Sequence, residues 1–261
     1  MNFSSDTLNK FSEILSMQPS DVVIFNFGTI VCHLGDNWKY IEVYDNNENL
    51  ISKLQLSLYD DANELGYDIC NLVFKPLMMN KEISKIKAQW DIAYNIVADL
   101  FKDKVDKGGH PYIGHLLRVY RDVENEKNKK CSDPDSTLSL FYEKASIAAL
   151  LHDVLEDTEM TIANLESKGF DEEIIKAVDA ITRRKEEYKY FDFIERVSKN
   201  DIARLVKIYD LEDNMNITRL NKFDEYEQKR LRKYFYCWKY LKGEINGIIC
   251  NNKIHPDRLL R

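Results

Sequence analysis

Residues 148–158 read AALLHDVLEDT, an apolar run of helical character that ends abruptly in four ionisable side chains. If the helix continues, His152 lies one turn before Glu156. Asp153 likewise lies one turn before Asp157. Burying four such groups beside an apolar run is costly unless something pairs with them, and a divalent cation would do so. The alternative is a helix end whose acids face water, because runs of charge are usually solvated.

Two further segments place similar side chains next to apolar helical stretches. Residues 107–118 read KGGHPYIGHLLR, in which two glycines and a proline favour a tight entry to a helix that carries His115 in an early turn. Residues 205–214 read LVKIYDLEDN, and a helix there places Asp210 and Asn214 one turn apart on one face. The chain therefore offers a histidine, then a His-Asp pair, then an aspartate.

Together, the three segments predict one metal site. Two imidazoles and two carboxylates suit a divalent transition metal such as Mn²⁺, Fe²⁺ or Zn²⁺, with positions left open for water. Hard oxygen donors and an octahedral preference favour Mn²⁺ among these ions. The predicted metal ligands are His115, His152, Asp153 and Asp210.

The same segments resemble the HD superfamily of metal-dependent phosphohydrolases. More narrowly, HPYIGH, LLHDVLEDT and VKIYDLEDN are similar to motifs in the hydrolase domain of RelA/SpoT-type enzymes and of small stand-alone alarmone hydrolases. The resemblance covers roughly residues 86–243, with several separate motifs in the family's order. It does not extend to residues 1–80.

The resemblance implies a role for each matching residue. The four predicted ligands match the family's metal ligands. Glu156 and Asp157 match the acidic pair of the HDxxED motif, which orients or activates the attacking water. Asn214 matches an asparagine that helps to hold the substrate. The basic residues expected to bind the phosphates of the substrate are Lys104, Lys107 and Arg184.

The function implied by the resemblance is hydrolysis of the 3′ diphosphate of guanosine tetra- or pentaphosphate, releasing pyrophosphate and GDP or GTP. One alternative is an HD phosphohydrolase that acts on the 2′-phosphate of NADPH or on a nucleoside monophosphate, because a fold and a metal site do not fix the substrate. Another alternative is a nucleotide-sensing or partner-binding regulatory protein. The acidic pair argues against a pure sensor, since sensing needs no water-activating group.

Several neighbouring residues are given structural interpretations. Glu212 and Asp213 flank Asn214, and we expect them to face solvent or to pair with a lysine. The tyrosine-rich run at residues 234–240 is expected to pack between helices rather than to stack on a base. Leu116 stands where the family often has proline, which leaves the predicted ligands untouched.

The fold class expected for most of the chain is mostly α. Glycine and proline are scarce, at 9 and 5 residues, and apolar residues recur at spacings of three and four from about residue 82. We predict an HD-domain helical bundle over residues 82–246 and a C-terminal tail over 247–261. The charged stretch at residues 124–134 is expected to be a loop. The predicted helices are 84–104, 112–126, 138–156, 161–169, 171–183, 188–198, 200–218 and 224–243.

The first 81 residues have a different character. Residues 20–59 are rich in β-branched and aromatic side chains with turn-forming asparagines between the runs, which predicts a small antiparallel sheet. Helical patterns at 6–17 and 62–79 flank this sheet. We therefore expect a small α+β N-terminal extension over residues 1–81, whose role the sequence does not indicate.

Composition limits the partners. The formal net charge of −7 disfavours binding to nucleic acid, whereas a small anionic nucleotide can still bind where a metal or local basic residues supply positive charge. Five scattered cysteines without a CxxC pair are typical of reduced thiols. With a polar N-terminus and no apolar run near the ~20 residues of a membrane span, we expect a cytoplasmic protein with a small-molecule nucleotide substrate and no membrane contact. The N-terminal extension leaves room for a protein partner or for self-association.

Overall fold

The chain forms two compact units in this computed structural model, Met1–Lys81 and Glu82–Arg261. Each unit is considered by itself. The residues that the structure describes are 22–25, 30–34, 40–44, 50–55, 75–134 and 136–245.

The described strands of the first unit form a four-stranded antiparallel meander in the order β1-β2-β3-β4. All of them lie within the range for which the sequence predicts a small sheet. The helix expected at residues 6–17, and residues 62–74 of the second expected helix, lie outside the described residues. The strands are β1 Val22–Phe25, β2 Ile30–Leu34, β3 Tyr40–Tyr44 and β4 Leu50–Gln55.

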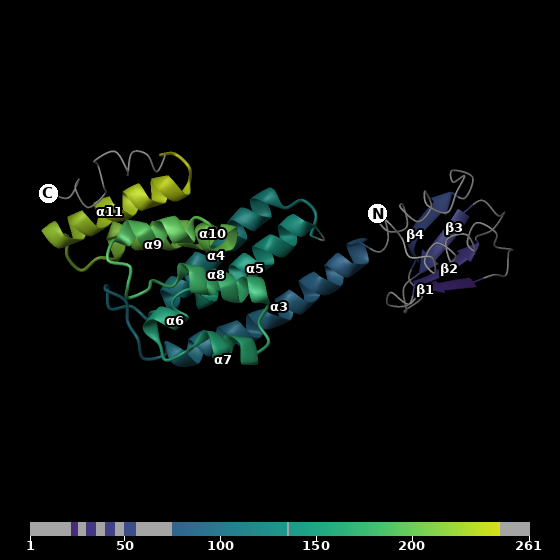
Figure 1. Ribbon diagram of the computed structural model, residues 1–261, viewed down its shortest axis with the longest axis horizontal. Coiled ribbons are helices and arrows are strands. Elements are labelled where there is room, and N and C mark those ends of the chain that lie inside the picture. The colour runs from purple at the N-terminus through teal and green to yellow at the C-terminus, as the bar shows by residue number, and fades with distance from the viewer. Residues whose placement is uncertain are drawn as a thin grey trace. The chain divides into compact units, whose positions relative to one another are not determined.

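The second unit is a helical bundle, as the sequence predicts (Figure 1). None of its described helices combines the length and the apolar character that a membrane span needs. The elements are α3 Lys75–Leu100, α4 Ile113–Lys130, α5 Thr137–Leu151, α6 Val154–Asp157, α7 Ile162–Ser167, α8 Glu172–Ile181, α9 Tyr190–Val197, α10 Asp201–Asn214, the 3₁₀ turn η4 Ile217–Arg219, and α11 Glu225–Leu241.

Helix α5 is the centre of this bundle. It starts at a serine cap, where the side chain of Ser136 accepts a hydrogen bond from the backbone N–H of Ser139. Every residue from Tyr142 to Leu151 is buried, because α4, α8 and α10 pack around the helix. The apolar core therefore surrounds the end of α5, which is where the ionisable residues begin.

The expected helix over residues 138–156 is interrupted at this end. Helix α5 stops at Leu151, and the short helix α6 starts at Val154. His152 and Asp153 form the turn between the two helices, with Asp153 at φ −101° and ψ 0°. The prediction of one continuous helix was wrong, and the turn presents the His-Asp pair at the end of a buried helix rather than along its side.

Helix α4 is longer than expected. It continues to Lys130 through a stretch that the sequence predicts as a loop. Glu124 pairs with Lys127, and Glu126 pairs with Lys130, at the three- and four-residue spacings that stabilise helices. Lysines in its last turn also interact favourably with the helix dipole.

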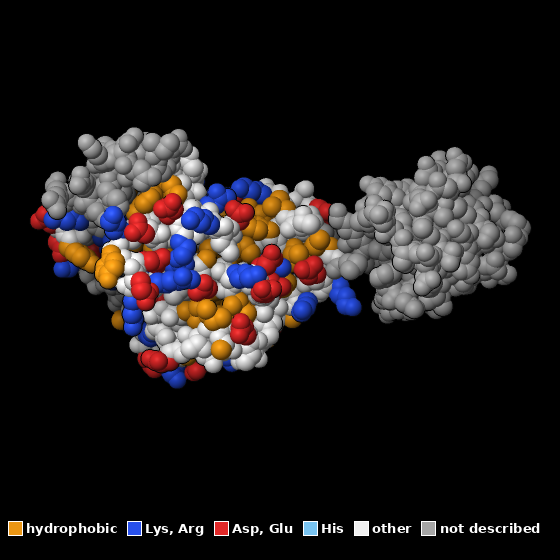
Figure 2. Space-filling model, in the orientation of Figure 1, with side chains coloured by type: hydrophobic (Ala, Val, Ile, Leu, Met, Phe, Trp, Pro, Cys, Tyr) orange, Lys and Arg blue, Asp and Glu red, His pale blue; other side chains and the backbone are white. Residues whose placement is uncertain are grey.

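Acidic and basic side chains are interspersed over the face of the helical unit shown in Figure 2. Apolar side chains appear between them in small groups rather than as one broad area.

Candidate metal centre

The four predicted ligand residues converge at one place in the bundle. His115 comes from the first turn of α4, Asp210 from α10, and the other two from the turn after α5. His115, His152 and Asp210 expose 3%, 2% and 3% of their surface, and Asp153 is half-buried. The packing of α4, α5 and α10 against one another brings the four residues together.

Their donor atoms face one another. The two histidine Nε2 atoms lie 3.3 Å apart. Asp153 Oδ2 lies 3.1 Å from His152 Nε2 and 3.6 Å from His115 Nε2. Asp210 Oδ1 lies 3.1 Å from His115 Nε2 and 3.6 Å from His152 Nε2. His115, His152 and Asp153 offer ligand atoms within 4.8 Å of one another, and the carboxylate of Asp210 lies beside both imidazoles. Two imidazoles and two carboxylates at this spacing suit one divalent metal.

The pKa shifts within the cluster also indicate that its two carboxylates need a positive charge beside them. Burial lowers the pKa of His152, but the charge of Asp153 and hydrogen bonds to both acids outweigh burial and raise that pKa well above its usual value. Burial raises the pKa of Asp210, but Lys207 and the two histidines hold it well below the usual range. Protons on the imidazoles thus supply the positive charge that the two acids require, and a divalent cation can replace them.

The other nitrogen of each histidine has its own partner. His152 Nδ1 lies 2.7 Å from the backbone carbonyl oxygen of Ala149. His115 Nδ1 lies 2.6 Å from Oδ2 of Asp213. Since these acceptors take the Nδ1–H, each Nε2 is left to face the cluster, as in many histidine-ligated metal sites.

Asp213 was expected to face solvent or to pair with a lysine, and that prediction was wrong. Its side chain is buried and contacts His115 together with the guanidinium groups of Arg118 and Arg219. A helix packed on both sides leaves no solvent-facing position three residues after Asp210, so the carboxylate points into the bundle.

Asp210 is held by two further residues of its own helix. Lys207 Nζ lies 2.7 Å from Asp210 Oδ2, and Asn214 Nδ2 donates to Asp210 Oδ1 at 2.6 Å. The ammonium group of Lys207 is largely buried and lies 5.2 Å from the ring centroid of Phe193. These contacts fix the Asp210 carboxylate with one oxygen toward the histidines.

Tyr112 makes a contact that the sequence did not reveal. Its hydroxyl donates to Asp153 Oδ2 at 2.7 Å, and its ring stacks on Phe101 with centroids 5.2 Å apart. Burial and the charge of Asp153 raise the pKa of Tyr112, so the hydroxyl stays protonated and remains a donor. The tyrosine therefore orients the oxygen of Asp153 that lies nearest the histidines.

The predicted acidic pair lies beside the cluster on α6. Glu156 accepts a hydrogen bond from the backbone N–H of Arg183 at 3.2 Å. Partial loss of hydration raises the pKa of Glu156. The residue still exposes part of its surface to solvent. The same loss of hydration, with the charge of Asp153, raises the pKa of Asp157. Both carboxyl groups therefore bind a proton more readily than the same acids do in water.

A cavity of about 570 Å³ opens next to these residues. Asp153, Asp210 and the acidic pair line it on one side. The aromatic side chains in its wall are Tyr112, Tyr190, Phe193, Tyr226 and Tyr234, and the basic ones are Lys107, Arg183, Lys207, Lys229, Arg230 and Lys233. The combination of acids near the cluster and many cations around it suits an anionic ligand.

Two of the four predicted substrate-binding residues line this cavity, Lys107 and Asn214. The other two are not among its lining residues. Lys104 Nζ donates to the backbone carbonyl of Asp157, and Arg184 pairs with Asp179 at 3.1 Å. The neighbouring Arg183, rather than Arg184, faces the cavity.

Helix α11 contributes lining residues that the sequence analysis missed. Lys229, Arg230, Lys233 and Tyr234 all face the cavity. The available signal was the four-residue spacing within the pairs Lys229–Lys233 and Arg230–Tyr234, which puts these side chains on one side of a helix. Tyr234 packs against the core, as the sequence predicts for the run at residues 234–240, and it also lines the cavity.

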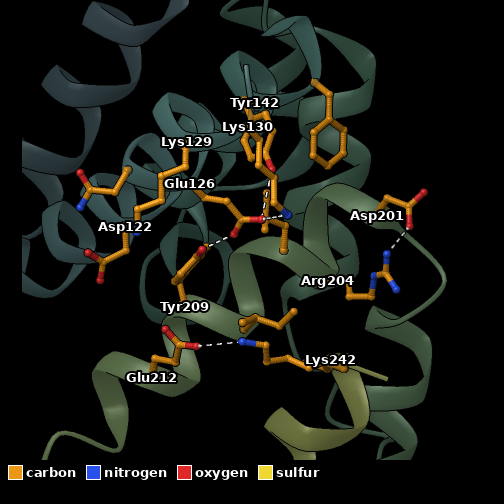
Figure 3. A pocket seen from close by; sticks show the side chains of 15 residues that line it. Asp122, Glu126, Lys129, Lys130, Tyr142, Asp201, Arg204, Tyr209, Glu212 and Lys242 are labelled. Atoms are coloured by element: carbon orange, nitrogen blue, oxygen red, sulfur yellow. Dashed lines mark hydrogen bonds and ion pairs between the residues drawn. The ribbon is translucent and has the colours of Figure 1, made fainter. Parts of the chain in front are cut away.

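A larger cavity of about 730 Å³ lies on another face of α10, and none of the predicted site residues lines it (Figure 3). Glu126 there accepts hydrogen bonds from Tyr142, Tyr209 and Lys130. Arg204 pairs with Asp201 at 3.2 Å. Most of its charges already have partners within the protein, so size alone does not make it the functional site.

Comparisons with known proteins agree with the motifs. No family model matches the sequence. A curated relative, the guanosine-3′,5′-bis(diphosphate) 3′-pyrophosphohydrolase MESH1 of Drosophila melanogaster, is 28% identical over 156 residues, which are 58% of this chain and 80% of that protein. A solved structure described as a metazoan ortholog of SpoT that hydrolyzes ppGpp and plays a role in starvation responses is 26% identical, with a TM-score of 0.47, and the match covers 67% of this chain and 94% of the other. The resemblance found in the sequence is confirmed, since the chain is similar to a MESH1-type ppGpp hydrolase over most of its helical region.

Proposed function

We propose that the protein is a metal-dependent phosphohydrolase that removes the 3′ diphosphate of guanosine tetra- or pentaphosphate, releasing pyrophosphate and GDP or GTP. The observation that carries the proposal is the buried set of two histidines and two aspartates beside a cavity lined by cations. The similarity to MESH1, whose name states this activity, supports the same class of substrate.

The proposed ligands are His115, His152, Asp153 and Asp210. When bound to such a set, a divalent ion supplies Lewis-acid polarisation of a phosphoryl oxygen and of water. We favour Mn²⁺, because the two carboxylates are hard oxygen donors and the mixed nitrogen and oxygen set tolerates octahedral coordination.

The proposed role of Glu156 and Asp157 is to orient the attacking water and to accept its proton. Their raised pKa values bring both groups closer to neutral pH, where a general base is most effective. The water oxygen forms a bond to the phosphorus attached to the ribose 3′ oxygen, and the bond between that phosphorus and the 3′ oxygen breaks. The 3′ oxygen takes up a proton and remains on the nucleotide, and the diphosphate leaves as pyrophosphate.

The basic side chains of the cavity have the proposed role of binding the phosphates. Lys107 and Arg230 come from opposite ends of the helical unit's sequence, yet both line the cavity. Cations on several sides can neutralise a substrate that carries two diphosphate groups, and little covalent help from the protein is needed for phosphoryl transfer. The rings of Tyr190 and Tyr234, which lie 5.7 Å apart, offer apolar surface for the purine.

Product analysis by liquid chromatography tests this proposal. The full chain with Mn²⁺ is offered guanosine tetraphosphate, NADPH, and nucleoside mono-, di- and triphosphates, with Asp153→Ala in parallel. We expect GDP and pyrophosphate from the wild type and no product from the variant. Consumption of another nucleotide in place of guanosine tetraphosphate would retain an HD phosphohydrolase but reject the substrate. Binding of nucleotide and metal without turnover of any compound would favour the sensor alternative.

A further inference from the structure

Helix α10 carries two carboxylates that contact opposite nitrogens of a single imidazole. Asp210 Oδ1 lies 3.1 Å from His115 Nε2, and Asp213 Oδ2 lies 2.6 Å from His115 Nδ1. The two aspartates are three residues apart, which places them on neighbouring positions of one helix face. One helix thus contacts His115 both at the nitrogen that faces the metal cluster and at the nitrogen behind it.

Asp213 is itself held rigidly. Arg118 Nε donates to Oδ1 at 2.6 Å and Arg118 Nη2 donates to Oδ2 at 3.3 Å. Arg219 Nη1 donates to Oδ2 and, at 3.1 Å, to the backbone carbonyl of Asp213. With 5% of its side chain exposed, Asp213 has little room to turn, and the two guanidinium groups compensate its buried charge.

The same network reaches the loop that precedes α4. Arg219 Nη2 lies 2.6 Å from Asp106 Oδ2. The other oxygen of Asp106 accepts hydrogen bonds from the backbone N–H groups of Gly108 and His110, each at 2.9 Å. Lys107 lies within this loop and lines the proposed substrate cavity. Hydrogen bonds through Arg219 and Asp106 therefore connect Asp213 to the loop that carries Lys107.

The two histidines differ in what holds them. The acceptor behind His152 is a neutral backbone carbonyl, whereas the acceptor behind His115 is a buried carboxylate. A carboxylate behind a ligating imidazole fixes the tautomer with the proton on Nδ1, fixes the ring orientation, and makes Nε2 a stronger donor to metal. Such a group acts on the metal through the histidine and does not touch the reacting atoms.

We infer that Asp213 is a positioning residue that fixes the His115 imidazole with Nε2 toward the metal, and that Arg118 and Arg219 hold Asp213 in place for this task. The inference rests on the proposed metal-dependent function and assigns a role to a residue outside the ligand set. It predicts that metal affinity depends on a carboxylate that contacts no metal.

The test compares Asp213→Asn with Glu212→Gln in the full chain. The second substitution makes the same carboxylate-to-amide change on the adjacent residue, whose side chain accepts a hydrogen bond from Trp238 instead. Dissociation constants for Mn²⁺ and Zn²⁺ are measured by competition with a chelator. We expect Asp213→Asn to weaken metal binding by roughly 10- to 100-fold and Glu212→Gln to leave it unchanged.

A spectroscopic measurement on the unaltered protein complements the variants. In the Zn²⁺-loaded wild type, nitrogen–proton correlation spectra should show His115 protonated at Nδ1, with a far-downfield proton that exchanges slowly because a buried carboxylate accepts it. The resonance is assigned by its loss in His115→Gln. Asp213→Asn should move this proton upfield, a change that a merely structural role would not produce.

The outcomes separate this inference from the proposed function. Equal metal affinity in Asp213→Asn and wild type, or a His115 proton on Nε2 in the Zn²⁺-loaded wild type, would overturn the inference and leave the metal site standing. Failure of the wild type to bind either Mn²⁺ or Zn²⁺ would overturn both the inference and the proposed metal-dependent function. If Asp213→Asn does not fold, the wild-type spectrum still decides the question.

Discussion

The Nε2 atoms of His115 and His152 face each other at 3.3 Å, although the two residues are 37 positions apart in the sequence. Each of these nitrogens also lies within 3.6 Å of two carboxylate oxygens. Such a buried cluster is stable when a positive charge lies among the two carboxylates. Protons fill that need in the absence of metal, and a divalent cation is better suited to do so.

Metal should stabilise the folded chain. An ion that binds the native cluster but not the unfolded chain adds about 2.7 kcal/mol to the free energy of unfolding at a concentration 100 times its dissociation constant. Thermal unfolding followed by circular dichroism should show a Tm that rises with added Mn²⁺ in the wild type and does not rise in His152→Ala. An unchanged wild-type Tm at saturating Mn²⁺ would argue against a metal bound at the cluster.

Glu156→Gln should separate metal binding from turnover. Glu156 lines the cavity but is not one of the proposed metal ligands, so the variant should bind metal as the wild type does. Loss of the proton acceptor should lower kcat by roughly 10²- to 10⁴-fold. Metal content by mass spectrometry and initial rates are measured on the same samples, with Glu159→Gln, an exposed neighbour, as the matched control. Full turnover in Glu156→Gln would remove this residue from the proposed chemistry.

Lys107→Ala should weaken substrate binding more than it slows the reaction. Lys107 lines the cavity, and partial loss of solvent lowers the pKa of its ammonium group, although the residue as a whole is exposed. Loss of one charge-assisted hydrogen bond to a phosphate should raise KM about tenfold with little change in kcat. Lys102→Ala, which removes an exposed lysine of the same segment paired with Asp99, serves as the control and should behave as wild type. Equal KM values for both variants would contradict the assignment of Lys107.

Much of the site follows from the sequence because the key residues lie in continuous motifs. His152 and Asp153 end an apolar run, and their predicted partners His115 and Asp210 each lie next to an apolar helical stretch, so that helix packing brings them inward. The acidic pair could be placed beside them from spacing alone. The fold of the helical unit was predictable because apolar residues recur at spacings of three and four through most of its sequence.

The remaining features depend on tertiary contacts that local patterns do not encode. Asp213 was expected to face solvent or to pair with a lysine, and only the positions of Arg118 and Arg219 show why it is buried. The cations of α11 reach the cavity from a helix that carries no motif. The break after Leu151 depends on how the end of α5 packs, which periodicity does not reveal.

Asp106 should contribute a pH-dependent part of the stability. Burial raises the pKa of Asp106, but hydrogen bonds from Arg219 and from the backbone N–H groups of His110 and Gly108 outweigh burial and lower it to about 2. Because the folded pKa lies below the unfolded value, this contribution is complete above about pH 4 and is lost as the pH falls toward 2. It amounts to about 2 kcal/mol at most.

Urea unfolding at several pH values measures this contribution. Asp106→Asn should be less stable than wild type at pH 7, and the difference should shrink as the pH falls from 5 to 2. Asp99→Asn removes an exposed carboxylate that pairs only with Lys102 among the described residues, so it should show little difference at any pH. A difference for Asp106→Asn that stays constant over this range would mean that its carboxylate charge is not responsible.

The proposed function requires that the cluster binds a metal and that this metal is needed for hydrolysis of an alarmone. The most direct measurement is a titration of metal-free full chain with Mn²⁺, in which pyrophosphate release from guanosine tetraphosphate is followed in wild type and in Asp210→Asn. We predict no release without metal, a rate that rises with Mn²⁺ and saturates in the wild type, and no comparable rise in Asp210→Asn. Release that persists in excess chelator, or a variant as active as wild type across the titration, would contradict the claim.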